Sequence, residues 1–254
     1  MEPIGRTLPL SPPRRWVADL MHFSRKVPLV TFQRRMRLGE LVAARKALPD
    51  PPSLVVLFLK AYGQVAARRP ELRRLYLPFP RPRLYEHPFS VATVAVERQW
   101  RGEPAVFFAP FRSPEEQSLS RLAEHLKRYK TAPVESVGVY RRLLRVSRYP
   151  LPLRRLLWWW ALNSSGNRRA RYAGTFSLSV TAGLGAAAVR LLSPSTATLH
   201  YAPLDPGGEM DVYLTFDHRV LDGAPVARAL ADLEETLCTG VTAELRQMRA
   251  APAA

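Results

Sequence analysis

Hydrophobic residues along this 254-residue chain follow two repeating patterns. Alternation of apolar and polar positions, which is typical of strands with one buried face, predicts strands at residues 29–38, 90–96, 104–108, 174–180, 196–201 and 209–216. Apolar positions at helical spacing predict helices at residues 14–23, 40–48, 54–69, 113–130, 134–165 and 226–237. Because strands and helices are mixed without strict alternation, we expect an α+β fold in which helices pack on a mixed or largely antiparallel sheet.

The last predicted strand leads directly into a cluster of polar residues. Val212, Leu214 and Phe216 occupy one face of that strand. The next seven positions contain Asp217, His218, Arg219, Asp222 and Gly223, and helical spacing then resumes. A histidine at this junction is a candidate for chemistry, because the loops that follow strands often carry functional groups on rigid scaffolds.

Two segments carry a resemblance to a known family. The block Asp-His-Arg-x-x-Asp-Gly at residues 217–223 resembles the signature of the acyltransferase (dihydrolipoyl transacylase) component of 2-oxo acid dehydrogenase complexes. A shorter His-x-x-x-Asp-Gly motif relates that family to chloramphenicol acetyltransferase. The segment Gly-Thr-Phe-Ser-Leu-Ser at residues 174–179 is similar to a second family segment. The family's Gly-Leu-x-x-Pro stretch is replaced here by Arg-Gly-Glu-Pro at residues 101–104.

The resemblance implies a chloramphenicol acetyltransferase-like two-layer sandwich, a homotrimer with active sites between subunits, and acyl-coenzyme A as a substrate. His218 is then the general base, since imidazole titrates in a suitable range. Ser179 is the candidate oxyanion donor without a nucleophilic role. Asp222 ion-pairs with an arginine in the family, and Arg14 is the first candidate partner, with Arg15 and Arg25 as alternatives.

Three further residues of the motif are assigned supporting positions. Gly223 is expected to let the backbone turn beside the site, and Asp217 and Arg219 are expected to be structural. No residue is assigned to contacts with coenzyme A.

The resemblance also suggests a domain plan. We expect an N-terminal arm at residues 1–12, a catalytic domain at residues 13–240 and a fraying tail at residues 241–254. No lipoyl or subunit-binding domain and no covalently bound lipoyl group are expected. The acceptor is then a thiol, hydroxyl or amine, for example a lipoyl group on another chain. A catalytically inactive trimeric scaffold and a membrane-surface acyltransferase acting on a lipid are the alternatives.

The formal net charge of +17 indicates an anionic partner such as coenzyme A or an anionic membrane surface, although arginine enrichment can also reflect genome composition. A single cysteine, Cys238, excludes a disulfide within the chain. His22, His87, His125 and His200 show no ligand spacing, so no metal site is expected. No apolar stretch is long enough to span a membrane, and we expect a cytoplasmic protein, with peripheral membrane association as an alternative.

Three consecutive tryptophans, Trp158, Trp159 and Trp160, cover most of the circumference of a predicted helix. At least one of them should therefore contact something other than the core of its own chain. A subunit interface or core is the favoured interpretation. A membrane-surface helix and an apolar acceptor pocket are the alternatives, and nucleic acid is not expected because no nucleic-acid motif accompanies the run.

Overall fold

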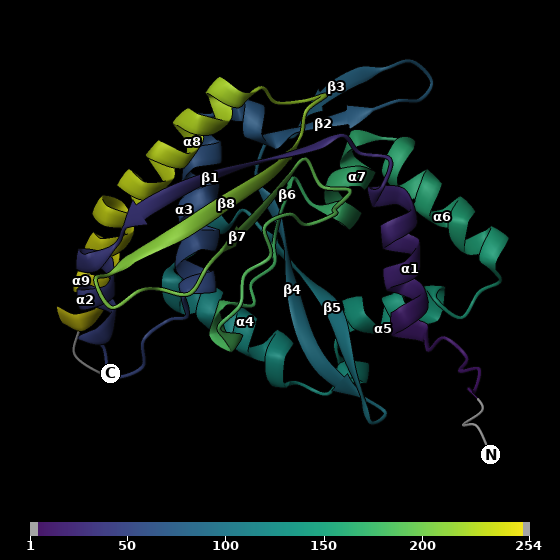
Figure 1. The fold of residues 1–254 in the computed structure, drawn as a ribbon, viewed down its shortest axis with the longest axis horizontal. Coiled ribbons are helices and arrows are strands. Elements are labelled where there is room, and N and C mark those ends of the chain that lie inside the picture. Colours follow the sequence, from purple (N-terminus) through teal and green to yellow (C-terminus); the bar gives the residue numbers. More distant parts are fainter. Residues whose placement is uncertain (1–4, 251–254) are drawn as a thin grey trace.

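A six-stranded sheet forms the centre of the computed structural model, which describes residues 5–250 (Figure 1). Its strands are β1 (Leu29–Arg37), β4 (Val91–Trp100), β5 (Glu103–Arg112), β6 (Phe176–Leu178), β7 (Ala197–Tyr201) and β8 (Glu209–Asp217). The strand order is β1-β8-β7-β6-β4-β5. β6 runs parallel to both β4 and β7, and the other neighbouring pairs are antiparallel, which confirms the predicted mixed sheet.

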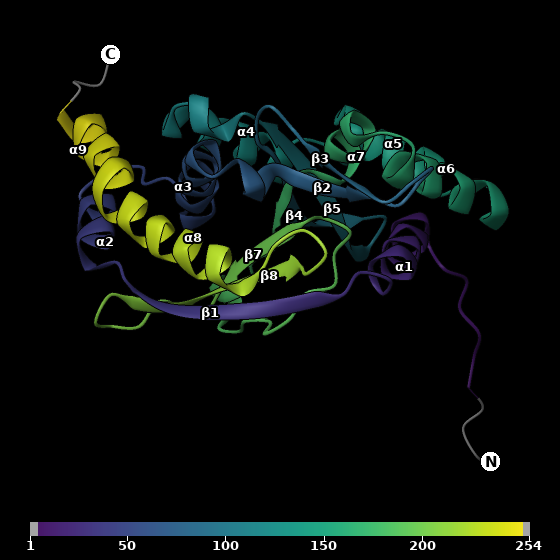
Figure 2. The same cartoon turned by 90° about the horizontal axis from the view of Figure 1, so that it is seen from above.

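Helices α3 (Leu54–Arg68), α4 (Leu119–Thr131) and α8 (Gly223–Thr236) pack on one face of this sheet (Figure 2). Leu214 and Phe216 of β8 lie in the same buried cluster as Phe58 and Val226 of these helices. The apolar face that alternation predicts for β8 therefore faces the core. The predicted two-layer α+β sandwich is confirmed.

A second group of helices lies beside the β4–β5 hairpin, at the right of Figure 1. It consists of α1 (Pro12–Ser24), α5 (Gly138–Val146), α6 (Leu151–Asn163) and α7 (Gly166–Ala173). The buried carboxylate of Asp19 on α1 accepts from Arg154 Nε at 2.8 Å and lies 3.1 Å from Arg155 Nε. This ion pair connects α1 to α6, two helices that are far apart in the sequence.

The strand β2 (Arg74–Leu77) pairs with β3 (Arg83–Glu86) as a separate hairpin. The predicted helix at 113–130 is interrupted: a 3-10 turn covers Pro114–Glu116, and α4 begins only after Ser118, whose Oγ accepts from Arg121 N. Helix α2 (Gly39–Lys46) follows β1 directly.

The segment that follows residue 240 is helical. A π-helical turn (Leu237–Val241) leads into helix α9 (Thr242–Ala250) where a fraying tail was predicted. Leu245 is fully buried, and Glu244 accepts from Leu119 N at 2.8 Å and lies 3.3 Å from Lys60 Nζ. The tail is thus held by packing and by charge, and residues 251–254 lie outside the described part.

The described part of the predicted N-terminal arm precedes the first helix. Residues 5–11 have no regular secondary structure, and α1 begins at Pro12 after an N-cap at Ser11. Residues 1–4 of the predicted arm lie outside the described range.

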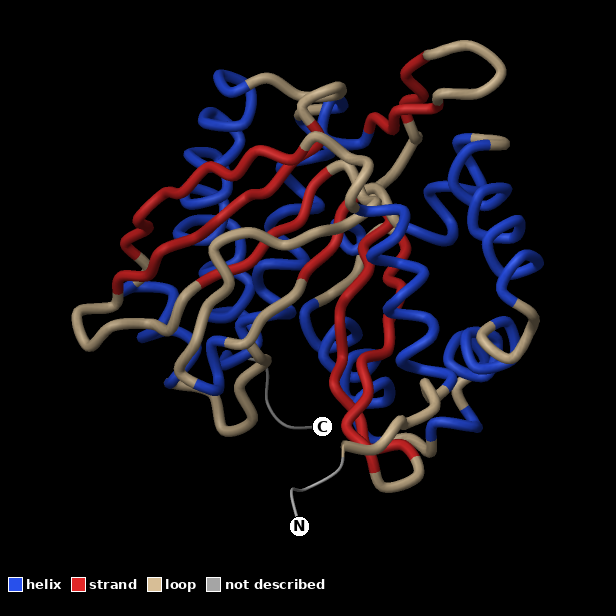
Figure 3. The backbone as a smooth tube through the Cα atoms, turned by 45° about the vertical axis from the view of Figure 1, so that its right-hand side comes forward, coloured by secondary structure: helices blue, strands red, loops and turns tan. Residues whose placement is uncertain are grey.

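The second face of the sheet carries a row of hydroxyl groups, one on each of five neighbouring strands, and Figure 3 shows these strands in red. Thr31, Thr215, Thr198, Ser177 and Thr93 are neighbours in register. The hydroxyls of Thr31 and Thr215 lie 2.9 Å apart, and those of Ser177 and Thr198 lie 2.7 Å apart. The row satisfies buried polar atoms without charge.

Candidate active site

The end of β8 is fixed by backbone hydrogen bonds on both sides. Asp217 N donates to Thr196 O at 2.8 Å, and His218 N donates to Pro28 O at 3.0 Å. The histidine thus leaves the sheet at the point where β1 and β8 meet. Its backbone position is set by strands that come from both ends of the sequence.

The side chain of His218 has a defined tautomer. Its Nδ1 lies 3.1 Å from the carbonyl oxygen of Leu221 and 3.6 Å from Asp222 Oδ1. A carbonyl oxygen can only accept, so Nδ1 carries the proton and Nε2 keeps its lone pair when the ring is neutral. The side chain is 50% exposed, so Nε2 can reach a substrate.

Asp217 and Arg219 form a closed pair beneath the histidine. Arg219 Nε donates to Asp217 Oδ1 at 2.9 Å, and its Nη2 donates to Oδ2 at 2.7 Å. The guanidinium of Arg219 also stacks over Tyr76 at 4.2 Å. This two-point pair holds the turn that follows His218.

A second arginine lies close to the same buried carboxylate. Arg169 donates to Leu162 O at 3.0 Å and to Pro194 O at 2.7 Å. Burial lowers the pKa of Arg169 to about 10, although the negative charge of Asp217 opposes this shift. Asp217 therefore balances buried positive charge as well as holding Arg219.

Asp222 has no arginine partner among residues 5–250. Its side chain is 83% exposed, and its Oδ1 lies 3.6 Å from His218 Nδ1. Arg14, the expected partner, is exposed on α1, where its backbone N–H donates to Ser11 Oγ. The pairing of Asp222 with Arg14, Arg15 or Arg25 is absent within this part of the chain.

Gly223 is required for a different reason from the one predicted. Its backbone has no left-handed conformation, but a Cβ there would lie 2.7 Å from Cζ of Phe32. The glycine therefore allows the start of α8 to approach β1.

Ser179 lies just beyond β6, which begins after a conformationally demanding glycine. Gly174 has φ of +79°, and a Cβ there would lie 2.7 Å from Thr93 Oγ1 and 2.8 Å from Val91 O. Ser179 N donates to Leu199 O at 3.2 Å, which continues the ladder with β7 and places Ser179 beside His200. The same ladder, continued from β7 to β8, gives the position of Ser179 relative to His218.

Ser179 and His218 do not meet within one chain. His200 faces Tyr213 on β8, and the step from residue 213 to residue 218 corresponds to about 17 Å along a strand. The two candidate catalytic side chains therefore point to different places on the same subunit.

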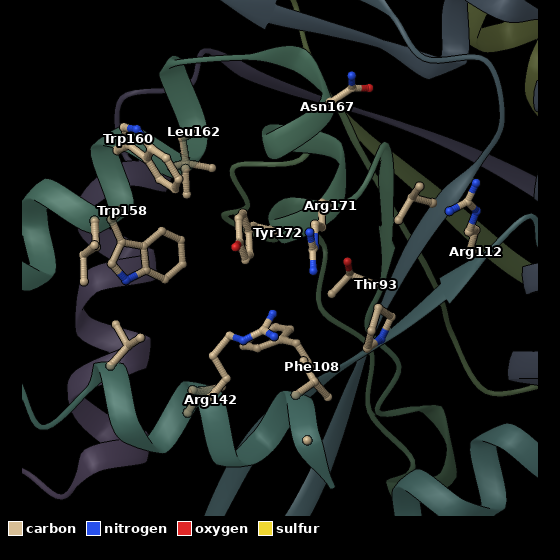
Figure 4. Close-up of a pocket in the computed structure, with 18 of the residues that line it drawn as sticks. Thr93, Phe108, Arg112, Arg142, Trp158, Trp160, Leu162, Asn167, Arg171 and Tyr172 are labelled. Atoms are coloured by element: carbon tan, nitrogen blue, oxygen red, sulfur yellow. The ribbon is translucent and has the colours of Figure 1, made fainter.

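A cavity lies elsewhere, between the β4–β5 hairpin and helices α1, α5, α6 and α7 (Figure 4). Its volume is about 1110 Å³, and His218, Ser179 and Asp222 are not among its lining residues. Trp158 is buried in its wall and Trp160 lies at its edge, whereas Trp159 faces a smaller cavity of about 240 Å³ that also includes Arg219. Among the lining residues, the sequence draws attention only to the tryptophans of α6, to His87 and to positions in the predicted strands.

Residues 5–250 contain no group of three or more histidine, cysteine, aspartate or glutamate side chains that could hold a metal ion. No helix in the same range is long and apolar enough to cross a membrane.

The fold is that of the chloramphenicol acetyltransferase-like acyltransferases. The Azotobacter vinelandii dihydrolipoamide acetyltransferase matches with a TM-score of 0.70 and 19% identity over 96% of this chain and 95% of that one. The cubic core of a pyruvate dehydrogenase multienzyme complex matches with a TM-score of 0.65 and 18% identity, over 96% and 95% of the two chains. Chloramphenicol acetyltransferase matches with a TM-score of 0.52 and 16% identity, over 86% and 94%.

Comparison of the sequence with protein-family models and with curated proteins gives no match. At these identities the structural likeness establishes the shared fold.

Proposed function

We propose that this protein is an acyltransferase that moves an acyl group between coenzyme A and an acceptor thiol, hydroxyl or amine, with His218 as the general base. The observation that carries the proposal is the hydrogen bond from His218 Nδ1 to the Leu221 carbonyl, which leaves Nε2 free at the end of β8. The same fold occurs in dihydrolipoamide acetyltransferases and chloramphenicol acetyltransferase.

The chemistry follows from that tautomer. Nε2 takes the proton of the acceptor as its sulfur, oxygen or nitrogen attacks the thioester carbonyl. The carbonyl oxygen becomes an oxyanion, to which the Ser179 hydroxyl donates a hydrogen bond. When the carbon–sulfur bond breaks, protonated His218 returns the proton to the leaving thiolate of coenzyme A.

The site requires two copies of the chain. Because one subunit separates His218 from Ser179 by about 17 Å along the sheet, the serine that meets a given histidine belongs to a neighbouring subunit. A trimer gives each histidine one such neighbour. The similar pyruvate dehydrogenase structure is the cubic core of a larger complex, so assembly on this fold has a precedent.

The Azotobacter enzyme offers a second line of support. Its structure was determined to investigate a serine, a histidine and an asparagine four residues after that histidine in the catalytic mechanism. The spacing from His218 to Asp222 is the same, and Ser179 supplies the hydroxyl. The chain thus has an aspartate where that enzyme has an asparagine.

The first test is transfer activity with acetyl-, succinyl- and longer acyl-coenzyme A donors. We expect His218→Ala to lower the transfer rate by about 10²–10⁴-fold, the range for a positioned general base. Ser179→Ala should lower it by about 10²–10³-fold. Full activity of His218→Ala would refute the assigned mechanism.

The second test determines whether one site uses two chains. His218→Ala and Ser179→Ala chains are co-expressed, purified together and compared with each variant alone. Random mixing should leave about a quarter of the sites with both wild-type residues, and activity should recover accordingly. Absence of recovery in mixed trimers would show that both residues act within one chain.

A further inference from the structure

The cavity beside the β4–β5 hairpin, here called the tryptophan cavity, has the size and lining of a ligand site. Its volume of about 1110 Å³ accommodates a long aliphatic or multi-ring molecule. Its apolar wall comes from α1, β5, α5, α6 and α7. That wall consists of Trp16, Phe108, Pro110, Val139, Leu143, Val146, Leu157, Trp158, Trp160, Leu162 and Tyr172.

The charged groups at this cavity are all positive. Arg112, Arg142 and Arg171 line it, and its lining contains no aspartate or glutamate. In Figure 4, Arg142 and Arg171 extend into the hollow from α5 and α7. Among residues 5–250 none of the three forms an ion pair, and two of them only stack on aromatic rings, Arg112 on Phe89 and Arg171 on Tyr172.

A histidine in the same wall stays neutral. Burial and the nearby charges of Arg112 and Arg73 lower the pKa of His87. Its imidazole therefore adds no positive charge at neutral pH, and the arginines alone set the preference for an anion.

Two buried donors in the wall lack acceptors. The indole nitrogens of Trp16 and Trp158 are buried and have no hydrogen-bond partner within the described residues. Trp158 itself is only 8% exposed, and its ring packs 4.6 Å from that of Trp16. Neither nitrogen has accessible surface, so the two rings offer the cavity their apolar faces and not their N–H groups.

The cavity also lies beside the strand that carries Ser179. Thr93 lines it and is in register with Ser177 on β6. Ser179 follows Ser177 by two residues on the same face, which places it about 7 Å from Ser177 along the strand direction. A ligand in the cavity is thus close to one component of the proposed transfer site.

We propose that the tryptophan cavity binds a long-chain organic anion, with its apolar body along the tryptophan wall and its carboxylate beside Arg142 and Arg171. The aromatic and aliphatic wall matches the body, and the unpaired guanidinium groups match the head. Binding itself is independent of the acyl transfer, whereas a role of this ligand as a transfer substrate rests on the proposed function.

The test is calorimetric titration of the whole chain with dodecanoate below its micelle concentration, beside dodecan-1-ol, dodecyl phosphate and butanoate. Dodecanoate should bind about tenfold or more tightly than dodecan-1-ol, because only the anion engages the arginines. Butanoate should bind far more weakly, since it buries little apolar surface. Stronger binding of dodecyl phosphate would identify a phosphate head as the preferred anion of the same chemical class.

Two pairs of variants locate the binding. Arg142→Gln should weaken dodecanoate binding about fivefold to tenfold, whereas Arg145→Gln, on the same helix but outside the lining, should leave it unchanged. Trp160→Ala should weaken it, whereas Trp159→Ala should not. These neighbouring tryptophans are 42% and 40% exposed, and only Trp160 lines the cavity.

Equal effects within either pair would overturn the assignment to this cavity. Equal affinity for dodecanoate and dodecan-1-ol would refute the preference for an anionic ligand. Binding to anionic vesicles without binding to dodecanoate would refute the cavity site and indicate a membrane surface instead. His218→Ala should bind dodecanoate like the unaltered chain. If His218→Ala binds dodecanoate and still transfers acyl groups at the full rate, the proposed function is refuted and the cavity proposal stands. If the unaltered chain transfers acyl groups but does not bind dodecanoate, the cavity proposal is refuted and the proposed function stands.

Discussion

The loop around His218 and the tryptophan cavity satisfy their polar groups in opposite ways. In the loop, Asp217 holds Arg219, and the Leu221 carbonyl accepts from His218, so the partners come from within five residues. In the cavity, Arg112, Arg142 and Arg171 have no carboxylate partner in the described range, and two indole N–H groups have no acceptor. The loop thus holds Asp217, Arg219 and His218 Nδ1 by local partners, whereas the cavity leaves guanidinium groups for another molecule.

This contrast has an energetic consequence. A buried group with a partner leaves that partner uncompensated when it is removed, which is costly. A group at a cavity edge that has no partner can be removed with little loss. Substitutions of charged residues in the loop should therefore lower the free energy of unfolding of the protein, whereas similar substitutions at the cavity should leave it almost unchanged.

The largest expected difference is between Asp217→Ala and Arg142→Ala. Loss of the buried Asp217 carboxylate would leave Arg219 unpaired and Arg169 without a nearby negative charge, at a cost of about 3–4 kcal/mol in the free energy of unfolding. Arg142→Ala should change it by less than about 0.5 kcal/mol. Urea denaturation of both variants measures this, and similar losses would contradict the contrast.

Acidification offers the next test, because the sheet contains one buried histidine, His200, and the cavity wall contains another, His87. Burial lowers the pKa of His200 to about 4. Between about pH 6.5 and pH 4 the unfolded chain binds a proton at this residue that the folded chain does not, so the free energy of unfolding falls as pH falls through that window. We expect His200 to account for about 2–3 kcal/mol of this loss.

The control for this prediction is a side chain that cannot take up the proton. His200→Gln should flatten the dependence of urea-unfolding midpoints on pH between pH 6.5 and pH 4. His87 contributes with the same sign, since burial also lowers its pKa, so His87→Gln should flatten the curve as well. An unchanged curve for His200→Gln would show that the residue is accessible to protons in the folded chain.

Two glycines give the third test. A Cβ at Gly223 would lie 2.7 Å from Phe32, whereas a Cβ at Gly138, at the cavity, would meet no atom within 4 Å. Gly223→Ala should therefore cost about 1–3 kcal/mol through overpacking, and Gly138→Ala should be neutral or stabilising by about 0.5–1 kcal/mol. Thermal denaturation distinguishes them, and a stable Gly223→Ala variant would show that β1 and α8 can separate without loss.

The same contrast explains what the sequence could predict. Residues 216–224 are contiguous, and their apolar alternation, histidine and helix spacing are visible in one window, so the strand end and the position of His218 were predictable. Gly174 to Ser179 is likewise one local segment. The mixed sheet followed from the strand patterns, because alternation reports burial of one face directly.

The cavity could not be predicted, because its wall comes from segments as distant as Trp16, Phe108 and Tyr172. The three consecutive tryptophans, Trp158 to Trp160, were the one local pattern that indicated an apolar pocket as an alternative. Helix α9 was missed because its composition is polar and Arg-rich, and its order comes from burial of Leu245 and from the contacts of Glu244 with Lys60 and Leu119. Tertiary contacts of this kind leave no local pattern.

The smallest expected effect concerns Asp222. Its carboxylate is 83% exposed and lies 3.6 Å from His218 Nδ1, so it is a surface charge within one chain. Asp222→Asn should therefore change the free energy of unfolding by less than about 0.5 kcal/mol, in contrast to the larger loss expected for Asp217→Ala. Thermal denaturation at several protein concentrations measures this. A loss above about 1 kcal/mol that grows with protein concentration would mean that a group from another copy holds Asp222, because only an intersubunit contact gains stability by mass action.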